Sequence, residues 1–496
     1  MQVRSPWEEA KPSREAGVCV YLISGWETCV PGELTAWLPT SASNAAFESC
    51  PHDVRPLTHD RGRHLLSAIG RIHDDPDEAP WIGVACHPAD AQPASVAAAP
   101  ASLFDRHESL RCDYVPGSSG GVFARRLLPP GLVEFEAVSP GFHDTSAAVH
   151  RVLVRHLAAT ANPSARPFSG FVTVESEERV TLFAAFDRVT FDGYSMYSVA
   201  DELPRLHRTF AAEDAPDPAL ALTASHLDHA AAERDFTGSL TATDPHLRPP
   251  ASTARRVRGR PRTPCRVGGS PRGSVQPRHG VAARRRERRG RRFRPAVSRL
   301  GHVHRADLHR DAAPGHRRTG RPRTVDRAGD DVDPRALRRP PGLDRVVRRR
   351  CSPVVDVDPA ADLRETATDV SAARSLSAPA GRIPLPVVGD LLGVSVEPGL
   401  VVSFMESTRT PGWREWRETE ARGFLGHVPL SDQMHAWVNV LPSGTFLEAL
   451  HPATPQCTAR VATLAVTMRS ALLSLIDPRR TLVPAPGASG EVRTSR

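Results

Sequence analysis

One block of a hundred residues, 251–350, constrains the fold of this chain more than any other feature. It holds 31 arginines and eight acidic residues, a formal charge of +23, with one phenylalanine and no tryptophan, tyrosine or isoleucine. A stretch with so much like charge and so little apolar mass cannot bury enough surface to offset the entropy lost on folding. The remainder of the chain carries a formal charge of −15, within an overall charge of +8. We therefore expect an ordinary folded protein that this block interrupts.

Three hypotheses explain the block. It is a basic arm that binds nucleic acid, a solvated linker, or the product of a GC-rich gene read out of register. The whole chain has 63 arginines and a single lysine, which indicates such a gene, and a shifted frame turns alanine and leucine codons into runs of Arg, Pro and Gly. Arginine runs at 284–289 and 348–350 fit that product, and the block lacks the interleaved aromatic residues on which bases stack. We favour the out-of-register hypothesis.

Composition also indicates in which cellular compartment the protein resides and which kinds of metal or redox site it can have. No run of about 20 apolar residues occurs, so we expect no membrane span, and the apolar patch at 18–23 is too short for a signal peptide. The eight cysteines are scattered without Cys-x-x-Cys spacing, which favours free thiols in a reducing cytoplasm over a zinc site or redox pair. The four histidines between 302 and 316 lie inside the block, and we attribute their clustering to chance. The sequence thus predicts a cytoplasmic protein without a metal site.

Outside the block, hydrophobic periodicity predicts helices and strands in an α/β protein. We expect helices at 57–73, at 93–111 with a break at Pro100, after an N-cap at Asp144 or Thr145, and from Ser195 onward. Strands are expected at 170–174 and 180–186, and the second is apolar on both faces, as in a central strand. Further strands are expected at 400–405, 433–440 and 445–450, followed by a helix with an apolar stripe from Val461 to Leu475.

These elements suggest five segments. They are an N-terminal extension (1–30), a first lobe (31–235), an anomalous or disordered arginine-rich segment (236–355), a second, incomplete lobe (356–478) and a disordered tail (479–496).

Three stretches carry residues that can be compared with known proteins. Residues 106–111 read Arg-His-Glu-Ser-Leu-Arg, residues 187–195 read Asp-Arg-Val-Thr-Phe-Asp-Gly-Tyr-Ser, and residues 431–439 read Ser-Asp-Gln-Met-His-Ala-Trp-Val-Asn. The first resembles the Arg-His-Glu-x-Leu-Arg element of the condensation-domain superfamily, the second stands in the place of its His-x-x-x-Asp-Gly motif, and the third is similar to one of its second-lobe strands. That superfamily includes nonribosomal-peptide condensation domains, polyketide-associated acyltransferases and chloramphenicol acetyltransferase.

The resemblance implies two lobes of chloramphenicol-acetyltransferase type with a substrate channel. It implies acyl transfer, in secondary-metabolite or lipid assembly, from a thioester on a phosphopantetheine carrier protein or on coenzyme A to an amine or hydroxyl acceptor, without a bound cofactor. Asp192 and Gly193 match the motif, and the resemblance gives Asp192 a structural role. Tyr194 and Ser195 flank the motif and are candidates to line the channel, although Ser195 is equally a helix N-cap.

The sequence departs from the family pattern at the position of the general base, which is Arg188. A histidine titrates near neutrality and can take a proton from the attacking group, whereas an arginine stays protonated. Arg188 retains the capacity to hold an anion or to stabilise charge on a tetrahedral intermediate. The family's Asp-Phe-Gly-Trp-Gly-like segment is also absent from the sequence. We therefore expect a condensation-type acyltransferase homologue that is catalytically impaired, a pseudoenzyme.

Two alternatives remain open. One is a non-catalytic protein whose lobes bind a carrier protein or another partner. The other is a nucleic-acid binder that acts through the arginine-rich segment, whose binding would depend steeply on salt.

Overall fold

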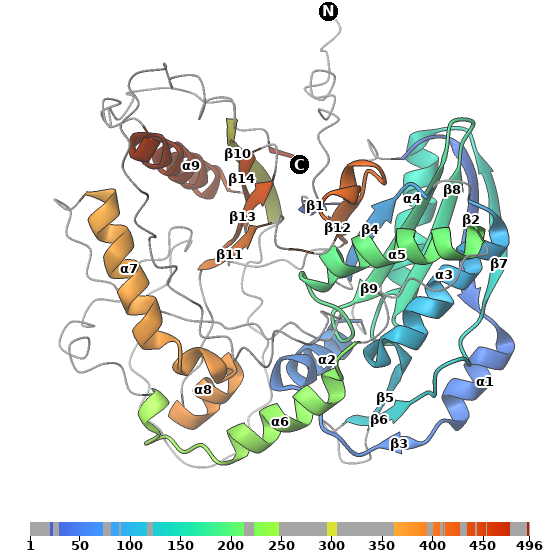
Figure 1. Ribbon diagram of the computed structural model, residues 1–496, viewed down its shortest axis with the longest axis horizontal. Helices are drawn as coiled ribbons and strands as arrows, with labels where there is room; N and C mark the ends of the chain where they lie inside the picture. The colour runs from blue at the N-terminus through green and yellow to red at the C-terminus, as the bar shows by residue number, and fades with distance from the viewer. Residues whose placement is uncertain are drawn as a thin grey trace, which may run out of the picture. The chain divides into compact units, whose positions relative to one another are not determined.

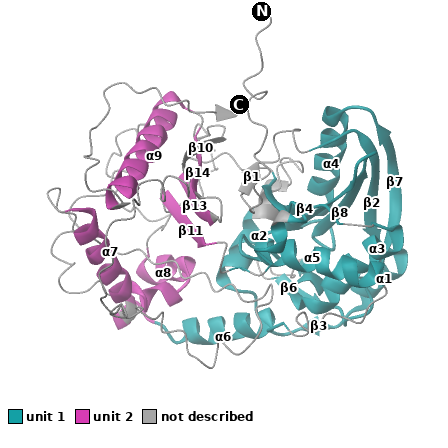
Figure 2. Ribbon diagram, turned by 45° about the horizontal axis from the view of Figure 1, so that its top comes forward, with its two compact units in different colours: residues 1–240, 305–348, 407–427 teal, residues 241–304, 349–406, 428–496 magenta. Residues whose placement is uncertain are grey.

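The computed structural model describes residues 20–22, 29–72, 81–88, 91–116, 123–212, 223–247, 295–304, 362–393, 400–406, 410, 412–426, 434–441, 444–452, 454–476 and 494–495. Figure 1 shows the course of the chain. The chain divides into two compact units, coloured separately in Figure 2. Unit 1 comprises residues 1–240, 305–348 and 407–427, and unit 2 comprises residues 241–304, 349–406 and 428–496.

Unit 1 is built on a seven-stranded sheet with the strand order β1-β12-β4-β9-β8-β2-β7. The strands are β1 (Val20–Leu22), β2 (Gly32–Pro39), β4 (Trp81–Cys86), β7 (Phe135–His143), β8 (Ser169–Glu175), β9 (Val180–Asp187) and β12 (Arg422–Leu425). The apolar character of β9 on both faces predicted a central strand, and β9 is the middle strand of the seven. That prediction is confirmed.

Helices cover both faces of this sheet. Helix α4 (Ser146–Thr160) packs on β8 and β2, while α3 (Pro93–Arg106) and α5 (Ser195–Ala211) pack against each other, with α3 on β7 and α5 on β4. The α4 face buries a cluster that includes Leu153, Val172 and Phe183. Burial of apolar surface against both faces makes this sheet the core of the unit.

The strand β12 enters this sheet from a distant part of the sequence. It lies between β11 and β13 of unit 2 along the chain, yet it pairs antiparallel with β4 and parallel with β1. Two glycines allow the close approach: a Cβ at Gly423 would overlap the sulfur of Met196, and one at Gly426 would overlap the ring of Trp81. A side chain at either position would therefore collide with the core of unit 1.

A second, smaller layer of unit 1 lies beside the end of β9. It contains the sheet β3-β6-β5, made of β3 (His52–Asp53), β5 (Cys112–Pro116) and β6 (Phe123–Leu127), together with α1 (Ser41–Ser49), α2 (His59–Ile72), η3 (Glu108–Arg111) and α6 (His226–Gly238). Leu65 of α2, Leu227 of α6 and Val189, which follows β9, belong to one buried cluster. This cluster fixes α2 next to the segment that follows β9. A short 3-10 turn, η11 (Glu415–Arg417), precedes β12.

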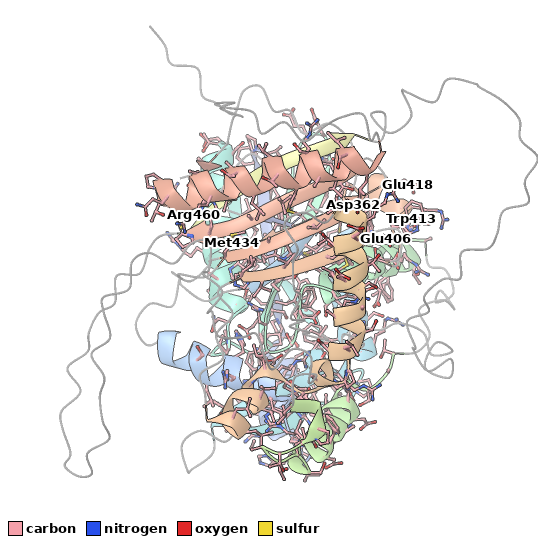
Figure 3. The ribbon with its side chains drawn as sticks, turned by 90° about the vertical axis from the view of Figure 1, so that its left-hand side faces the viewer. Asp362, Glu406, Trp413, Glu418, Met434 and Arg460 are labelled. Carbon is pink, nitrogen blue, oxygen red and sulfur yellow. The ribbon has the colours of Figure 1, made fainter. Side chains whose placement is uncertain are left out.

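Unit 2 contains a five-stranded sheet with the order β11-β13-β14-β10-β15. Its elements are η5 (Pro245–Leu247), β10 (Pro295–His304), α7 (Leu363–Ser377), η9 (Ala380–Arg382), α8 (Leu385–Leu392), β11 (Leu400–Glu406), β13 (Met434–Leu441), β14 (Gly444–Pro452), α9 (Pro455–Ile476) and β15 (Thr494–Ser495). Helix α9 lies along the sheet in Figure 3 and buries Val461 and Ala465 against Met434 and Ala436. The expected strands and the expected final helix are all present.

Two sequence expectations differ from the structure. The helix expected to break at Pro100 continues to Arg106, because Val96, Ala99, Pro100, Leu103 and Phe104 are all buried and their packing outweighs the disruption by proline.

Within the arginine-rich block, residues 295–304 form β10, which pairs with β14. That stretch carries one arginine in ten residues, so it lacks the charge that argues against folding elsewhere in the block. The rest of the block, like the tail at 479–496 apart from β15, lies outside the described residues.

The α/β class expected from the sequence is confirmed. Of the helices that the structure describes, none is both long and apolar enough to cross a membrane. The five cysteines among the described residues (29, 50, 86, 112 and 457) are buried free thiols.

Candidate active site

The segment that resembles the family motif forms a tight turn between β9 and α5, and we call residues 187–193 the motif loop. The backbone N–H groups of Thr190 and Phe191 both donate to the carbonyl of Asp187 at 3.1 Å. Phe191 is buried and stacks on Phe186 of β9, with ring centroids 4.3 Å apart. Arg188, by contrast, is exposed. The loop thus buries its apolar side chains and presents residue 188 at its surface.

Asp192 organises the start of the helix that follows the motif loop. Its Oδ1 accepts from the backbone N–H of Tyr194 at 3.0 Å, the backbone N–H of Ser195 at 2.8 Å and the Ser195 hydroxyl at 2.9 Å. The first turn of a helix has N–H groups without intrahelical partners, and a carboxylate there also interacts favourably with the helix dipole. These contacts fit the structural role that the resemblance implied for Asp192.

Tyr194 and Ser195 differ in accessibility. The Tyr194 side chain is half-buried, and burial, with a contribution from the charge of Asp192, raises the pKa of its hydroxyl. Ser195 is only 1% exposed and its hydroxyl is committed to Asp192. Of the two residues, Tyr194 is therefore the one whose side chain can reach a molecule outside the unit.

The chemistry open to the motif loop follows from Arg188. A guanidinium at this position is a cation with several N–H donors and can bind a carboxylate, a phosphate or an oxyanion. It cannot remove a proton from an amine or hydroxyl at neutral pH. The loop therefore supplies a binding group where the family pattern has a base.

Two residues at this site were not singled out from the sequence. Asp187, the last residue of β9, is fully buried, and its Oδ1 lies 3.1 Å from Nε2 of His64 on α2. Asp187 precedes the motif position directly and could have been noticed for that reason. His64 carries no sequence signal, since only the packing of α2 beside the loop brings these two residues together.

The Arg-His-Glu-Ser-Leu-Arg stretch joins four elements of unit 1. His107 is fully buried, with Nε2 2.7 Å from Glu202 of α5, and Arg106 Nε donates to the same carboxylate at 3.2 Å. Burial alone would raise the pKa of Glu202, but His107 and Arg106 outweigh it and lower that pKa. Glu108 accepts from the backbone N–H of Leu227 in α6 at 2.9 Å. These contacts describe a structural junction.

The third stretch of the resemblance belongs to unit 2. Residues 431–433 lie outside the described residues, and the rest of the stretch runs along β13. His435 is stacked on Trp437, with ring centroids 6.1 Å apart. Asn439 is buried and donates to Glu448 of β14 at 3.1 Å. Within the part of the chain that the structure describes, no group of three or more His, Cys, Asp or Glu side chains is placed to hold a metal ion.

Comparisons with known proteins bear on the fold. No family model matches the sequence, and no curated protein matches it. In structure, the chain is similar to PapA2 acyl transferase, with a TM-score of 0.68 and 16% identity over 92% of this chain and 99% of that one. It is also similar to the first condensation domain of the calcium-dependent antibiotic synthetase (TM-score 0.55, 16% identity, 88% of this chain and 100% of that one). The starter condensation domain of rhizomide synthetase RzmA gives a TM-score of 0.52 and 12% identity over 85% and 95% of the two chains.

These likenesses define the class to which the fold belongs. The chain has the fold that these condensation-domain and acyl transferase structures share, and the fold that the resemblance implied is confirmed. At 12–16% identity the likeness concerns the fold alone.

Proposed function

We propose that this chain is a condensation-type acyltransferase homologue in which acyl transfer is impaired. The reaction is transfer of an acyl group from a carrier-protein or coenzyme A thioester to an amine or hydroxyl. The observation that carries the proposal is Arg188, which is exposed on the motif loop at the position of the general base. Loss of a positioned base costs typically about 10²–10⁴-fold in rate.

The preserved parts of the site support an acyltransferase ancestry. The motif loop follows the central strand β9, and Asp192 accepts hydrogen bonds from the first residues of the helix behind it. A variant of the structurally similar starter condensation domain of RzmA was solved in complex with C8-CoA and Leu-SNAC. A coenzyme A or carrier thioester as donor and an amine as acceptor are therefore the substrate classes to try first. The proposal needs no bound cofactor, because the donor brings its own activated thioester.

The test compares the chain with its Arg188→His variant, both with the arginine-rich block replaced by the sequence that the shifted reading frame encodes. Thiol release from a panel of acyl-CoA thioesters, from acetyl-CoA to palmitoyl-CoA, is followed with amine and alcohol acceptors including Leu-SNAC. We expect release by the wild-type chain to be close to background and release by Arg188→His to rise by at least about 100-fold. Arg188→Lys is the matched control, since it keeps a cation and supplies no base at neutral pH. A wild-type rate equal to that of Arg188→His would contradict impairment at this position.

A second candidate function is binding without turnover, and the same residue favours it. A carrier or coenzyme A thioester carries phosphate groups that an exposed guanidinium can bind. In that case Arg188→His would leave the transfer rate at background, and Arg188→Gln would weaken the binding of coenzyme A in a titration. Nucleic-acid binding through the arginine-rich segment is a further proposal, which loss of duplex DNA binding on deletion of residues 251–350 would support.

A further inference from the structure

A fully buried carboxylate lies next to the position of the missing base. Asp187 is 0% exposed, and among the described residues its carboxylate has two partners. Oδ1 accepts the backbone N–H of Val189 at 2.7 Å, and His64 Nε2 lies 3.1 Å from Oδ1 and 3.4 Å from Oδ2. In its Nε2–H tautomer, His64 donates to this carboxylate.

Burial makes this pair costly to break. A carboxylate removed from water needs hydrogen bonds or an opposite charge to remain in the folded protein. His64 is the only described side chain that bonds to this carboxylate, and its own side chain is 15% exposed. The orientation of Asp187 therefore depends on a residue more than a hundred positions earlier in the chain.

Helix α2 holds the motif loop at further points. Arg61, one turn before His64, donates to the carbonyl of Thr190 at 3.3 Å. Leu65 lies in the same buried cluster as Val189. Helix α2 thus holds the residues on both sides of Arg188. His64 bonds to Asp187, and Leu65 packs in the same cluster as Val189, whose N–H in turn bonds to Asp187.

We infer that His64 is a positioning residue for the motif loop. Through Asp187 it fixes the backbone at 187–189 and so determines how the side chain at 188 is presented. Its consequence for catalysis rests on the proposed function, but its effect on the loop does not. His64 acts through the hydrogen bond to Asp187, so a side chain that keeps a donor at the place of Nε2 preserves the role.

Hydrogen exchange at the Val189 amide tests the inference without reference to activity. The His64→Asn amide is too short to reach Asp187, whereas the His64→Gln amide ends near the place of Nε2. We expect His64→Asn to speed Val189 exchange by at least about tenfold and His64→Gln to change it by less than about threefold. Amides of α4 serve as a reference for global unfolding, and Arg63→Ala, an exposed site on the same helix, is the matched control. Unchanged exchange in His64→Asn, or equal acceleration by both variants, overturns the inference.

A second measurement separates this inference from the proposed function. In the Arg188→His background, His64→Asn should lower kcat about tenfold or more with KM unchanged, because a misplaced base affects the reaction and not substrate binding. His64→Gln should retain kcat. If Arg188→His itself gains no transfer, the proposed function fails, and the exchange result alone decides the role of His64. If kcat responds equally to Asn and Gln, the positioning role in catalysis is wrong.

Discussion

Asp192 and Arg188 lie in the same turn and have separate roles. Asp192 forms hydrogen bonds to the first turn of α5, so the loop can fold whichever side chain stands at 188. Arg188 is exposed, so its side chain is not part of the buried core. The proposed function requires this separation, because it has the site lose its base and keep its shape.

Replacement of Asp192 tests this separation. Asp192→Ala removes three hydrogen bonds to Oδ1 and should lower the free energy of unfolding by about 1–2 kcal/mol, the usual cost of a lost N-cap. Asp192→Asn keeps an oxygen at the same place and should cost less than about half as much. Denaturant unfolding of both variants measures the difference. Equal losses for Ala and Asn would show that charge, and not the hydrogen bonds, is what Asp192 supplies.

The ionisation of the Asp53 carboxyl should make the free energy of unfolding depend on pH. Burial raises the pKa of its carboxyl, but hydrogen bonds from Arg55 and Arg125 outweigh this and lower it to about 2. A carboxyl with a depressed folded-state pKa stabilises the fold above its unfolded value of 3.8, and this contribution is lost as pH falls towards 2. The wild-type chain should therefore lose more free energy of unfolding between pH 5 and pH 2 than Asp53→Asn, by on the order of 1 kcal/mol. Parallel curves for the two proteins would contradict the assignment.

At the scale of elements, β12 places a remote segment inside the sheet of unit 1. The backbone of β12 at Gly423 passes so close to the side chain of Met196 that a Cβ at this position would overlap it. Strand pairing with β4 and β1 then completes the sheet on this side.

The substitution Gly423→Ala tests that close approach. The added methyl group overlaps the end of the Met196 side chain, which has to move within the core, and we expect a loss of about 1 kcal/mol in the free energy of unfolding, at the low end of the cost of overpacking. Gly238→Ala is the control, because a Cβ at Gly238 meets nothing within 4 Å. Its unfolding free energy should stay within about 0.5 kcal/mol of the wild type. A Gly423→Ala protein as stable as this control would show that β12 is not tightly packed.

The elements also show what could be predicted from the sequence. Strand β9 and helix α9 have strong apolar patterns of their own, so both were predicted close to their observed bounds. Strand β12 is four residues long, and its place depends on pairing with β4, which a local pattern does not contain. The same limit applies at the site: the motif itself identified Arg188, whereas His64 reaches Asp187 only through tertiary packing.

At the scale of the whole molecule, charge is distributed very unevenly along the sequence. The block at 251–350 carries +23 and the remainder −15. Strand β10 is the only described part of the block. The out-of-register hypothesis for the block as a whole stays a prediction about the gene.

The nucleotide sequence of the gene tests this hypothesis. We expect a frame shifted by one base, across the codons for 180–360, to replace the arginine-rich block with an Ala-, Leu- and Val-rich stretch that has helical or strand periodicity. The check is resequencing of that region and translation of all three frames. If no frame gives such a pattern, the arginines are a selected feature. Binding of duplex DNA that falls steeply with salt then becomes the expected property of the block.

The pH profile of kcat/KM for acyl transfer tests whether residue 188 is the position of a lost base. We expect a wild-type rate near background at every pH. It predicts that Arg188→His restores transfer with a rate that rises through about pH 6.5, as a neutral imidazole forms. Arg188→Lys should stay at background across neutral pH. Substantial wild-type transfer, or a pH profile that is the same for wild type and Arg188→His, would contradict the account.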